Sequence, residues 1–279
     1  MNSHLQILVR GGGDLASGVI HRLVKGGFRV LILETDHPMA IRRQVSFCEA
    51  VYEGSAVVEG IRAVRVNDLS EIDPVCATGA VPLLVDPKAE CLGELKPHVV
   101  VDAIMAKRNL GTRIDMAPLT IALGPGFTAG KDVHLVIETM RGHDLGRVIT
   151  SGCALPDTGV PGKIGGYTKE RVIHSPAAGI LRNISSIGDR VEKGQAIAFI
   201  ETFEGEKITI PASISGILRG LIRDGFSVSC GFKIADIDPR EAELKNCFTI
   251  SDKSRCIAGS VLEAVCAFAF AREGAAIHD

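Results

Sequence analysis

The chain of 279 residues has no tryptophan, two tyrosines and an aromatic content of only 4%. A stacking platform for single-stranded nucleic acid is built from aromatic side chains, so none is expected. An excess of one charge is lacking too, since 31 Lys and Arg against 33 Asp and Glu leave a net charge of −2. Binding to a nucleic-acid backbone requires a concentrated positive face. We therefore expect no nucleic-acid partner.

Long hydrophobic runs are also missing. The longest, Val99–Ala106 and Val265–Ala271, fall well short of the roughly 20 residues that span a bilayer. The first residues, Met1–Arg10, lack the basic and apolar segments of a signal peptide. The sequence therefore predicts a cytoplasmic protein without membrane association.

Closely spaced metal ligands are absent as well. The eight cysteines include no pair at C-x-x-C spacing, and the eight histidines are scattered. Scattered thiols in a cytoplasmic protein are usually small buried apolar residues, and we expect no metal site. Cys153 lies in a segment that looks exposed, and it is the one cysteine that we consider as a candidate functional thiol. The alternative is that this thiol has no role in the function.

With 46% hydrophobic and 23% charged residues, the chain has the composition of a globular protein. Its first part predicts a strand at Gln6–Arg10, a helix with apolar residues at helical spacing, and a second strand at Phe28–Leu33. The glycine pair Gly26-Gly27 ends the helix between them. This order indicates the β-α-β unit of a nucleotide-binding fold.

The loop after the first strand carries the spacing Gly11-x-Gly13-x-x-Ala16, which matches the dinucleotide-binding pattern. Glycines let a pyrophosphate approach the backbone at a helix N-terminus, and an acid some 20 residues on, here Glu34, binds a ribose hydroxyl. Asp14 would place a carboxylate close to that phosphate, which argues against phosphate binding. The alternative to a nucleotide site is a glycine turn that serves packing alone. The predicted cofactor-binding residues here are Gly11, Gly12, Gly13, Asp14, Ala16, Ser17 and Glu34.

A second glycine-rich loop follows the apolar segment Leu119–Leu123 and contains Gly124 and Gly126. The apolar runs Val81–Val85 and Val99–Ile104 suit buried parallel strands, whose carboxyl ends face the ligand in open α/β sheets. The predicted site therefore also includes a rim of basic residues that could bind an anion. The alternative for the glycines is a tight turn between two strands, and the alternative for the basic residues is that they are solvated loop charges. The rim residues are Lys107, Arg108, Arg141 and His143.

Residues 173–201 and 210–238 repeat each other at an offset of 37, so that Gly179–Arg182 matches Gly216–Arg219. Repetition at fixed spacing indicates two related β-units. The pattern resembles the barrel-sandwich hybrid of biotinyl and lipoyl domains. The position of the modified lysine is occupied by Glu204 and Lys207 is out of register, so no biotin or lipoate attachment is expected.

These segments predict an α/β fold class: a Rossmann-like parallel sheet domain plus a small all-β barrel-sandwich hybrid. The expected divisions are a cofactor-binding domain at 1–150, a Gly/Pro-rich linker at 151–170, the hybrid at 171–240 and a C-terminal segment at 241–279. Within the last, Ile257, Val261 and Val265 form an apolar stripe at helical spacing. We expect that helix to pack on the first domain.

Long strings along nearly the whole chain resemble one family, the YqeB-type accessory proteins of selenium-dependent molybdenum hydroxylases. The first domain is also similar to the Rossmann part of xanthine dehydrogenase accessory factors. The strings are Arg10–Ser17, Met39–Val45, Ala50–Gly54, Lys107–Thr112, Gly124–Gly130, Val136–Leu145, Thr158–Thr168 and Lys233–Arg240.

The resemblance implies a maturation factor that binds a molybdopterin-type dinucleotide and assists its selenium loading or insertion. Its implied partners are the hydroxylase apoenzyme and selenium-delivery proteins. The resemblance implies no catalytic residues, and whether the protein is an enzyme stays open. The residues leave two further functions possible: an NAD(P)-dependent oxidoreductase, indicated by the glycine pattern, and a non-catalytic docking scaffold.

Overall fold

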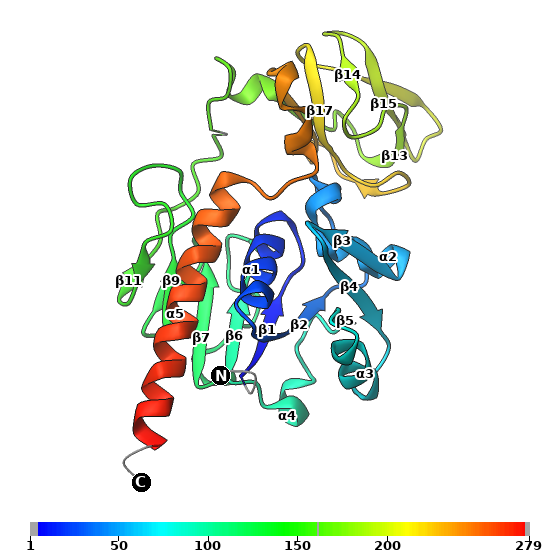
Figure 1. Cartoon of the computed structure of the whole chain (residues 1–279). Helices are drawn as coiled ribbons and strands as arrows, with labels where there is room; N and C mark the ends of the chain where they lie inside the picture. Colours follow the sequence, from blue (N-terminus) through cyan, green and yellow to red (C-terminus); the bar gives the residue numbers. More distant parts are fainter. Residues whose placement is uncertain (1–4, 161, 277–279) are drawn as a thin grey trace. The chain divides into compact units, whose positions relative to one another are not determined.

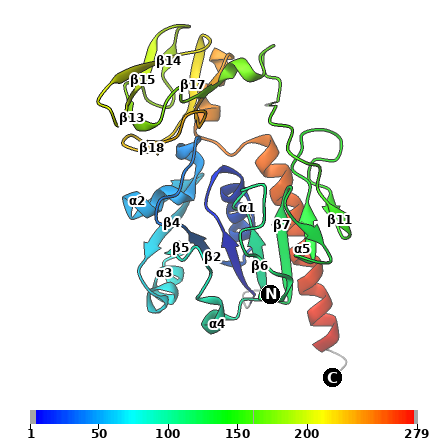
Figure 2. The ribbon, with the colours of Figure 1, turned by 180° about the vertical axis from the view of Figure 1, so that it is seen from behind.

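The computed structural model describes residues 5–160 and 162–276, with side chains up to Arg272 in the last helix. The chain forms two compact units (Figures 1 and 2). Unit 1 comprises Met1–Pro38, Ser46–Asp157 and Ile250–Asp279, and unit 2 comprises Met39–Val45 and Thr158–Thr249. The short segment Met39–Val45 thus joins unit 2 although its neighbours on both sides belong to unit 1.

Unit 1 is built on a nine-stranded mixed sheet with the order β10-β9-β7-β6-β1-β2-β5-β4-β3. Seven strands, from β9 to β4 in that order, run parallel, and each end of the sheet carries one antiparallel strand. The strands are β1 Gln6–Arg10, β2 Arg29–Glu34, β3 Ser55–Val58, β4 Ile61–Val66, β5 Val81–Val85, β6 Val99–Asp102, β7 Leu119–Leu123, β9 Leu135–Ile137 and β10 Val148–Ile149.

The central strands are buried because their residues are apolar and mostly β-branched or leucine. Residues 7–10 of β1 and all of β6 and β7 are buried, as suits strands covered on both faces. At one end, β3 and β4 are joined by Glu59-Gly60, whose φ angles of 44° and 82° are both positive. Such two-residue turns connect antiparallel strands, which explains the reversed direction of this end strand.

Two long helices lie side by side in unit 1 (Figure 1): α1 Asp14–Lys25 and α5 Asp252–Ala276. They approach closely at Gly18, where an added Cβ would overlap the hydroxyl of Ser254. That hydroxyl donates to the carbonyls of Asp14 and Leu15, both at 3.3 Å. The shorter helices are α2 Ala50–Glu53, α3 Ile72–Ala77 and α4 Leu92–Leu95, with 3-10 turns at Phe47–Glu49, Leu69–Glu71 and Ile114–Met116.

The stretch Glu241–Arg272 is long and apolar enough, by length and composition alone, to cross a membrane. Its apolar stripe is nevertheless buried within unit 1, since Ile257, Val261 and Val265 are fully covered and α5 contacts α1 and β9. The apolar stripe of α5 therefore packs inside unit 1.

Unit 2 consists of two four-stranded antiparallel sheets, β12-β19-β17-β14 and β16-β15-β13-β18. The repeat relates them, because the equivalent strands β13 and β17 occupy the same place in the two sheets. Each half contributes its short strand, β14 or β18, to the sheet of the other half. The strands are β12 Val172–His174, β13 Gly179–Asn183, β14 Arg190–Val191, β15 Ala196–Glu201, β16 Lys207–Pro211, β17 Gly216–Leu221, β18 Ser227–Val228 and β19 Lys233–Asp238.

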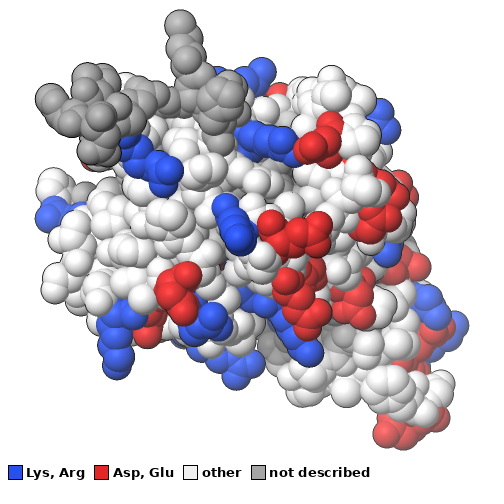
Figure 3. All heavy atoms as spheres, turned by 90° about the horizontal axis from the view of Figure 1, so that it is seen from below, with Lys and Arg blue, Asp and Glu red and all other residues white. Residues whose placement is uncertain are grey.

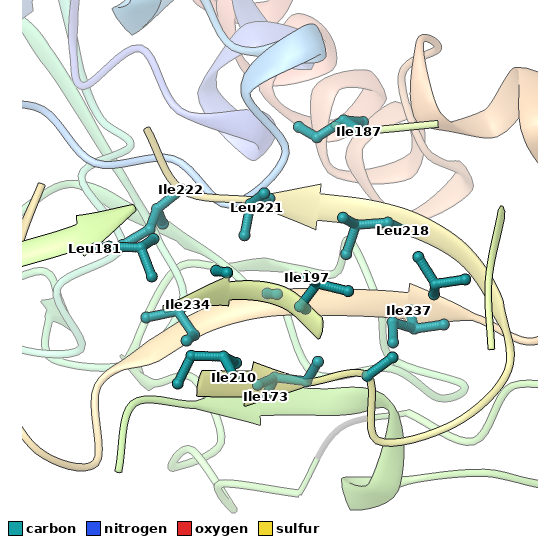
Figure 4. Close-up of a cluster of buried hydrophobic side chains, with 14 of the residues drawn as sticks. Ile173, Leu181, Ile187, Ile197, Ile210, Leu218, Leu221, Ile222, Ile234 and Ile237 are labelled. Atoms are coloured by element: carbon teal, nitrogen blue, oxygen red, sulfur yellow. The ribbon is translucent and has the colours of Figure 1, made fainter. Parts of the chain in front are cut away.

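Side chains from both sheets form the single apolar core of unit 2 (Figure 4). Leu181 and Ile197 from one sheet are fully buried with Leu218 and Ile234 from the other. The 3-10 segment Glu241–Cys247 contacts β17 and adds Cys247 to this core. A further 3-10 turn, Lys169–Arg171, precedes β12, and another lies at Arg43–Val45.

The expected fold class is wrong. A Rossmann-like parallel sheet and a small all-β barrel-sandwich hybrid were expected, whereas the structure has a large mixed sheet and separate antiparallel sheets. The apolar runs indicate buried strands but not the direction of the two end strands. A two-residue turn reverses the chain between β3 and β4, and the segment 138–147 reverses it between β9 and β10. The linker expected at 151–170 begins with a strand, since β11 Gly152–Cys153 pairs with β8 Thr128–Ala129.

Candidate functional site

The parallel strands β1, β6, β7 and β9 end at one edge of the sheet, here called the carboxyl edge. Open α/β sheets bind ligands at this edge, outside the point where the strand order reverses. In unit 1 that point lies between β1 and β6, because β2 follows on the opposite side of β1. The predicted site residues of both glycine-rich loops lie along this edge.

The first glycine-rich loop is closed by the protein's own backbone. Gly11 has a φ of +98°, and its N–H donates to the carbonyl of Leu33 at 2.7 Å. A Cβ on Gly11 would lie 3.0 Å from the carbonyl oxygen of Ala103, in the segment that follows β6. A Cβ on Gly12 would lie 2.9 Å from the backbone nitrogen of Cys48. These glycines therefore permit close packing of neighbouring chain segments.

Glu34 turns back onto this loop. Its carboxylate accepts the Gly12 N–H at 2.6 Å and the Thr35 N–H at 2.9 Å. Burial raises the pKa of Glu34, and the two N–H donors oppose that shift. Glu34, which was expected to bind a ribose, thus accepts the Gly12 N–H, which was expected to bind a pyrophosphate.

Gly13 differs from its two neighbours, because no atom comes within 4 Å of a Cβ added there. It is the N-cap residue of α1 and provides no side-chain cap. Asp14 begins the helix, whereas Ala16 and Ser17 are buried. The Ser17 hydroxyl donates to the Gly12 carbonyl at 3.1 Å and accepts the Phe47 N–H at 2.9 Å, so this residue serves the fold.

A buried polar network fills the point where the strand order reverses. Arg10 and Asp102 lie at the ends of β1 and β6, are 2% exposed, and approach to 3.8 Å. Thr112 joins them, since its hydroxyl accepts from Arg10 and donates to Asp102 at 2.5 Å. Arg10 also donates to the Pro87 carbonyl at 2.8 Å. Burial raises the pKa of Asp102, against the hydrogen bonds that it accepts from Thr112 and Ile104 and the charge of Arg10.

The second glycine-rich loop packs against the basic loop after β6. A Cβ on Gly126 would lie 2.7 Å from the backbone of Arg108, and one on Gly124 would lie 2.6 Å from the Thr139 hydroxyl. Lys107 has a positive φ of 61°, which is uncommon outside glycine, and its amine pairs with Asp157 at 2.6 Å. The structure therefore brings Lys107, Arg108, Gly124 and Gly126 together.

The other two rim residues follow β9. Arg141 forms a bidentate ion pair with Asp252 at the start of α5. Its Nη1 and Nη2 donate to the two carboxylate oxygens of Asp252 at 2.9 and 3.0 Å. This pairing raises the pKa of Arg141, against its partial burial. His143 is exposed, and its side chain makes no hydrogen bond or ion pair with the described residues. The described contacts therefore do not join His143 to the other rim residues.

Lys253 is the residue at this edge that the sequence analysis missed. It is half-buried in the first turn of α5, and its amine makes no hydrogen bond or ion pair within the described part of the chain. Burial lowers the pKa of Lys253, and the charge of Arg141 lowers it further, while Asp14, Asp157 and Glu138 oppose the shift. A cation is disfavoured at a helix N-terminus, which is a sequence signal that could have identified this lysine.

The charged residues around this amine are here called the Lys253 cluster. Glu138, at the end of β9, is 3% exposed and accepts the N–H groups of Met140 at 2.7 Å and Leu155 at 2.8 Å. The acids of the cluster are therefore engaged elsewhere, whereas the Lys253 amine is not. The cluster consists of Asp14, Lys107, Glu138, Arg141, Asp157, Asp252 and Lys253.

Neither metal ligation nor thiol chemistry is indicated by the geometry. Among the described residues, no group of three or more His, Cys, Asp or Glu side chains is placed to hold a metal ion. Cys153 is exposed on β11, and its sulfur lies 3.4 Å from the Thr128 hydroxyl. No charged group pairs with this thiol in the described part of the chain.

Comparison with known proteins gives one close relative of undetermined function. No family model matches the chain. It is 52% identical over 264 residues to a protein of Escherichia coli (strain K12) described as uncharacterized protein YqeB, and the alignment covers 95% of the chain and 48% of that protein. The chain thus spans about half the length of this curated relative.

Distant similarity to solved structures was also found. One is the ectoine utilization protein EutE (DoeB) from Ruegeria pomeroyi, at 12% identity and a TM-score of 0.28 over 85% of this chain and 86% of that one. Another is an aspartoacylase family protein from Mesorhizobium loti, at 15% identity and a TM-score of 0.29 over 86% and 87%. Similarity this low assigns no activity to this chain.

The expected role in maturation of selenium-dependent molybdenum hydroxylases is wrong by these findings. The solved structures are described as an ectoine utilization protein, an aspartoacylase family protein and a succinylglutamate desuccinylase, and the curated relative is described as uncharacterized. None of these descriptions mentions molybdenum, selenium or a hydroxylase. The expectation came from sequence strings, several of which now have a structural explanation, such as the packing of Gly11 and Gly12.

Proposed function

We propose that unit 1 binds a small molecule at the carboxyl edge and that an anionic group of this ligand pairs with Lys253. The observation that supports this proposal is an amine without a hydrogen-bond partner among the described residues, half-buried beside Asp14, Glu138 and Asp157. Burying an ammonium group costs free energy unless a partner offsets it. A bound phosphate or carboxylate group would be that partner.

The start of α1 supports the same location. Its N-cap residue, Gly13, has open space at its Cα and no capping side chain, and it lies at the positive end of the helix dipole. The N–H groups of Gly11 and Gly12 are engaged by Leu33 and Glu34. The ligand that best fits therefore presents a single phosphate or carboxylate to this end of the helix.

The first experiment is a binding assay on the purified chain. Thermal shift and calorimetry would compare orthophosphate, pyrophosphate, CMP, NAD and NADP. A ligand at 100 times its dissociation constant adds about 2.7 kcal/mol to the stability, which a thermal shift detects. We expect binding of a monophosphate-bearing compound, and binding of NAD or NADP alone would favour the dinucleotide reading of the first glycine-rich loop.

Substitution of the lysine then tests its role. Lys253→Met should weaken the binding about 10-fold or more, because a charge-assisted hydrogen bond is lost, and Lys253→Arg should restore part of it. The matched control is Lys131→Met, which removes an exposed lysine from the turn before β9. Equal affinity in Lys253→Met and the wild type would contradict the proposal.

We further propose that the protein resides in the cytoplasm. All eight cysteines are free, and three of them, Cys48, Cys91 and Cys247, are buried as small apolar residues. Scattered free thiols are typical of a reducing compartment. Fractionation of cells that express the protein would test the location.

A further inference from the structure

A second candidate site lies at the opposite edge of the sheet in unit 1, where β6 and β7 begin. A groove of about 710 Å³ runs between the residues before these strands, the helix α4 and the end of α5. Figure 3 shows this face of unit 1, where Lys and Arg side chains lie beside uncharged surface and beside Asp and Glu side chains. The lining of the groove includes Leu92, Lys96, His98, Met116, Pro118 and Arg272.

The charges of this groove are unevenly distributed. Its lining contains three permanent cations and one carboxylate, Asp115, which pairs with Arg113 at 3.0 Å. Lys96 and Arg272 make no ion pair with any residue that the structure describes, and Arg272 stacks on the Phe268 ring at 5.5 Å. The whole chain has a net charge of −2, so this local excess of positive charge does not follow from composition.

Lys96 reaches the groove from an unfavourable backbone conformation. It ends α4 with φ 42° and ψ 61°, and its N–H donates to the Leu92 carbonyl at 3.1 Å. Glycine is the usual residue at this left-handed position, and another residue costs about 1 kcal/mol or more. The lysine places a cation at the groove where the fold alone favours glycine.

His98 adds an uncharged donor. Its Nδ1 accepts the N–H of Gln6 at 3.2 Å, so the proton of the neutral ring resides on Nε2. Burial lowers the pKa of His98, and the charge of Arg272 lowers it further. Near neutral pH the ring is therefore uncharged and its Nε2–H is available as a donor.

We propose that this groove binds a small organic anion, with a phosphate or carboxylate group on an apolar body. Lys96 and Arg272 pair with the anionic group, and His98 donates to one of its oxygens. Leu92, Met116 and Pro118 lie along the groove and contact the apolar body. This site is independent of the one proposed at Lys253, since the two lie at opposite ends of the parallel strands.

Phenyl phosphate is a suitable probe, because it combines a doubly charged group with an apolar ring. Calorimetry would measure its affinity for the full chain and for Lys96→Gly, Arg272→Gln and the double variant. We expect each single change to weaken binding about 10-fold, as the loss of a charge-assisted hydrogen bond does. Glycine accepts the left-handed conformation at position 96, so a loss of binding in Lys96→Gly cannot reflect unfolding.

Two controls separate this site from other causes. Lys88→Gln removes an exposed lysine outside the groove and should bind phenyl phosphate as the wild type does. Lys253→Met removes the amine of the carboxyl edge and should keep the binding that depends on Lys96 and Arg272. Unchanged affinity in the double variant would overturn the proposal. Loss of all phenyl phosphate binding in Lys253→Met would also overturn the proposal, because it would assign the probe to the carboxyl edge alone.

Discussion

The two glycine-rich loops of unit 1 follow parallel strands of one sheet, yet different groups pack against them. After β1, Glu34 and the segments at Cys48 and Ala103 occupy the loop. After β7, the loop supports Lys107 and Arg108 next to a cluster in which Lys253 has no hydrogen-bond partner among the described residues. A glycine pattern indicates that another group approaches the backbone closely. That group can be a ligand or another segment of the protein.

The comparison extends to the polar groups. Near β1, the charges of Arg10 and Asp102 are joined through Thr112 and fully buried. Near β9, Arg141 and Asp252 are paired but largely exposed. The first arrangement holds the fold together, whereas the second leaves its charges accessible to solvent and ligand.

The largest effect is expected from Asp102→Ala. This change leaves the buried guanidinium of Arg10 without its carboxylate, which should lower the free energy of unfolding by about 3–5 kcal/mol. Urea denaturation would measure it. Asp115→Ala breaks an exposed pair with Arg113 and should cost about 0–1 kcal/mol. Similar losses in both variants would show that the Arg10 network is not structural.

The glycines of the first loop offer a sharper test. Gly12→Ala places a Cβ against the Cys48 backbone and should cost about 1–3 kcal/mol in unfolding free energy. Gly13→Ala meets no atom within 4 Å, and only the capping preference changes, by less than about 1 kcal/mol. Guanidinium denaturation of the two variants compares neighbouring glycines directly. A larger loss at Gly13 would reverse the distinction drawn here.

Glu34 should make stability depend on pH. Because burial raises its pKa, the folded chain holds this proton more tightly than the unfolded chain does. The stabilising contribution is fully present below the unfolded pKa of about 4.5 and is lost as the pH rises through the higher folded pKa. Unfolding of wild type and Glu34→Gln, followed from pH 4 to 8, should show a wild-type decline that the variant lacks. Parallel profiles would contradict it.

The smallest effect concerns Lys253 without ligand. Its pKa is lowered, so the folded chain releases this proton at a lower pH than the unfolded chain. The cost of the buried charge is therefore full below the folded pKa and disappears as the pH rises toward 10.5. Lys253→Met should accordingly unfold at slightly higher temperature than the wild type at pH 7 and lose this advantage near pH 10. A less stable variant at pH 7 would indicate a hidden partner for the amine.

Much of the central sheet could be predicted from sequence, because buried parallel strands require continuous apolar runs. The segments expected at Gln6–Arg10, Val81–Val85 and Leu119–Leu123 are β1, β5 and β7. The end strands β3 and β10 were not predicted, and a turn such as Glu59-Gly60 reverses the chain without changing the composition of its strands. The class of fold was therefore wrong although its central elements were found.

The contacts of the candidate site were even harder to predict from the sequence than the direction of the strands. Lys107 and Arg141 were selected as loop cations, but nothing local indicates that they pair with Asp157 and Asp252. Lys253 is more than 100 residues from Glu138, and only the packing of α5 against α1 and β9 brings the lysine to the carboxyl edge. Charge partners distant in sequence are decided by helix packing, which apolar periodicity does not resolve.

The sequence by itself determined the apolar strands of the sheet, the start of α1 at the glycines, the repeat that yields two equivalent sheets in unit 2, and the apolar stripe of α5. These features depend on spacing between near neighbours, which the chain carries locally. Only the tertiary structure decided that Glu34 and Cys48 close the first loop and that Lys253 lies unpaired among the described charges at the carboxyl edge. Those outcomes depend on burial and on contacts between distant segments, which exist only once the chain has folded.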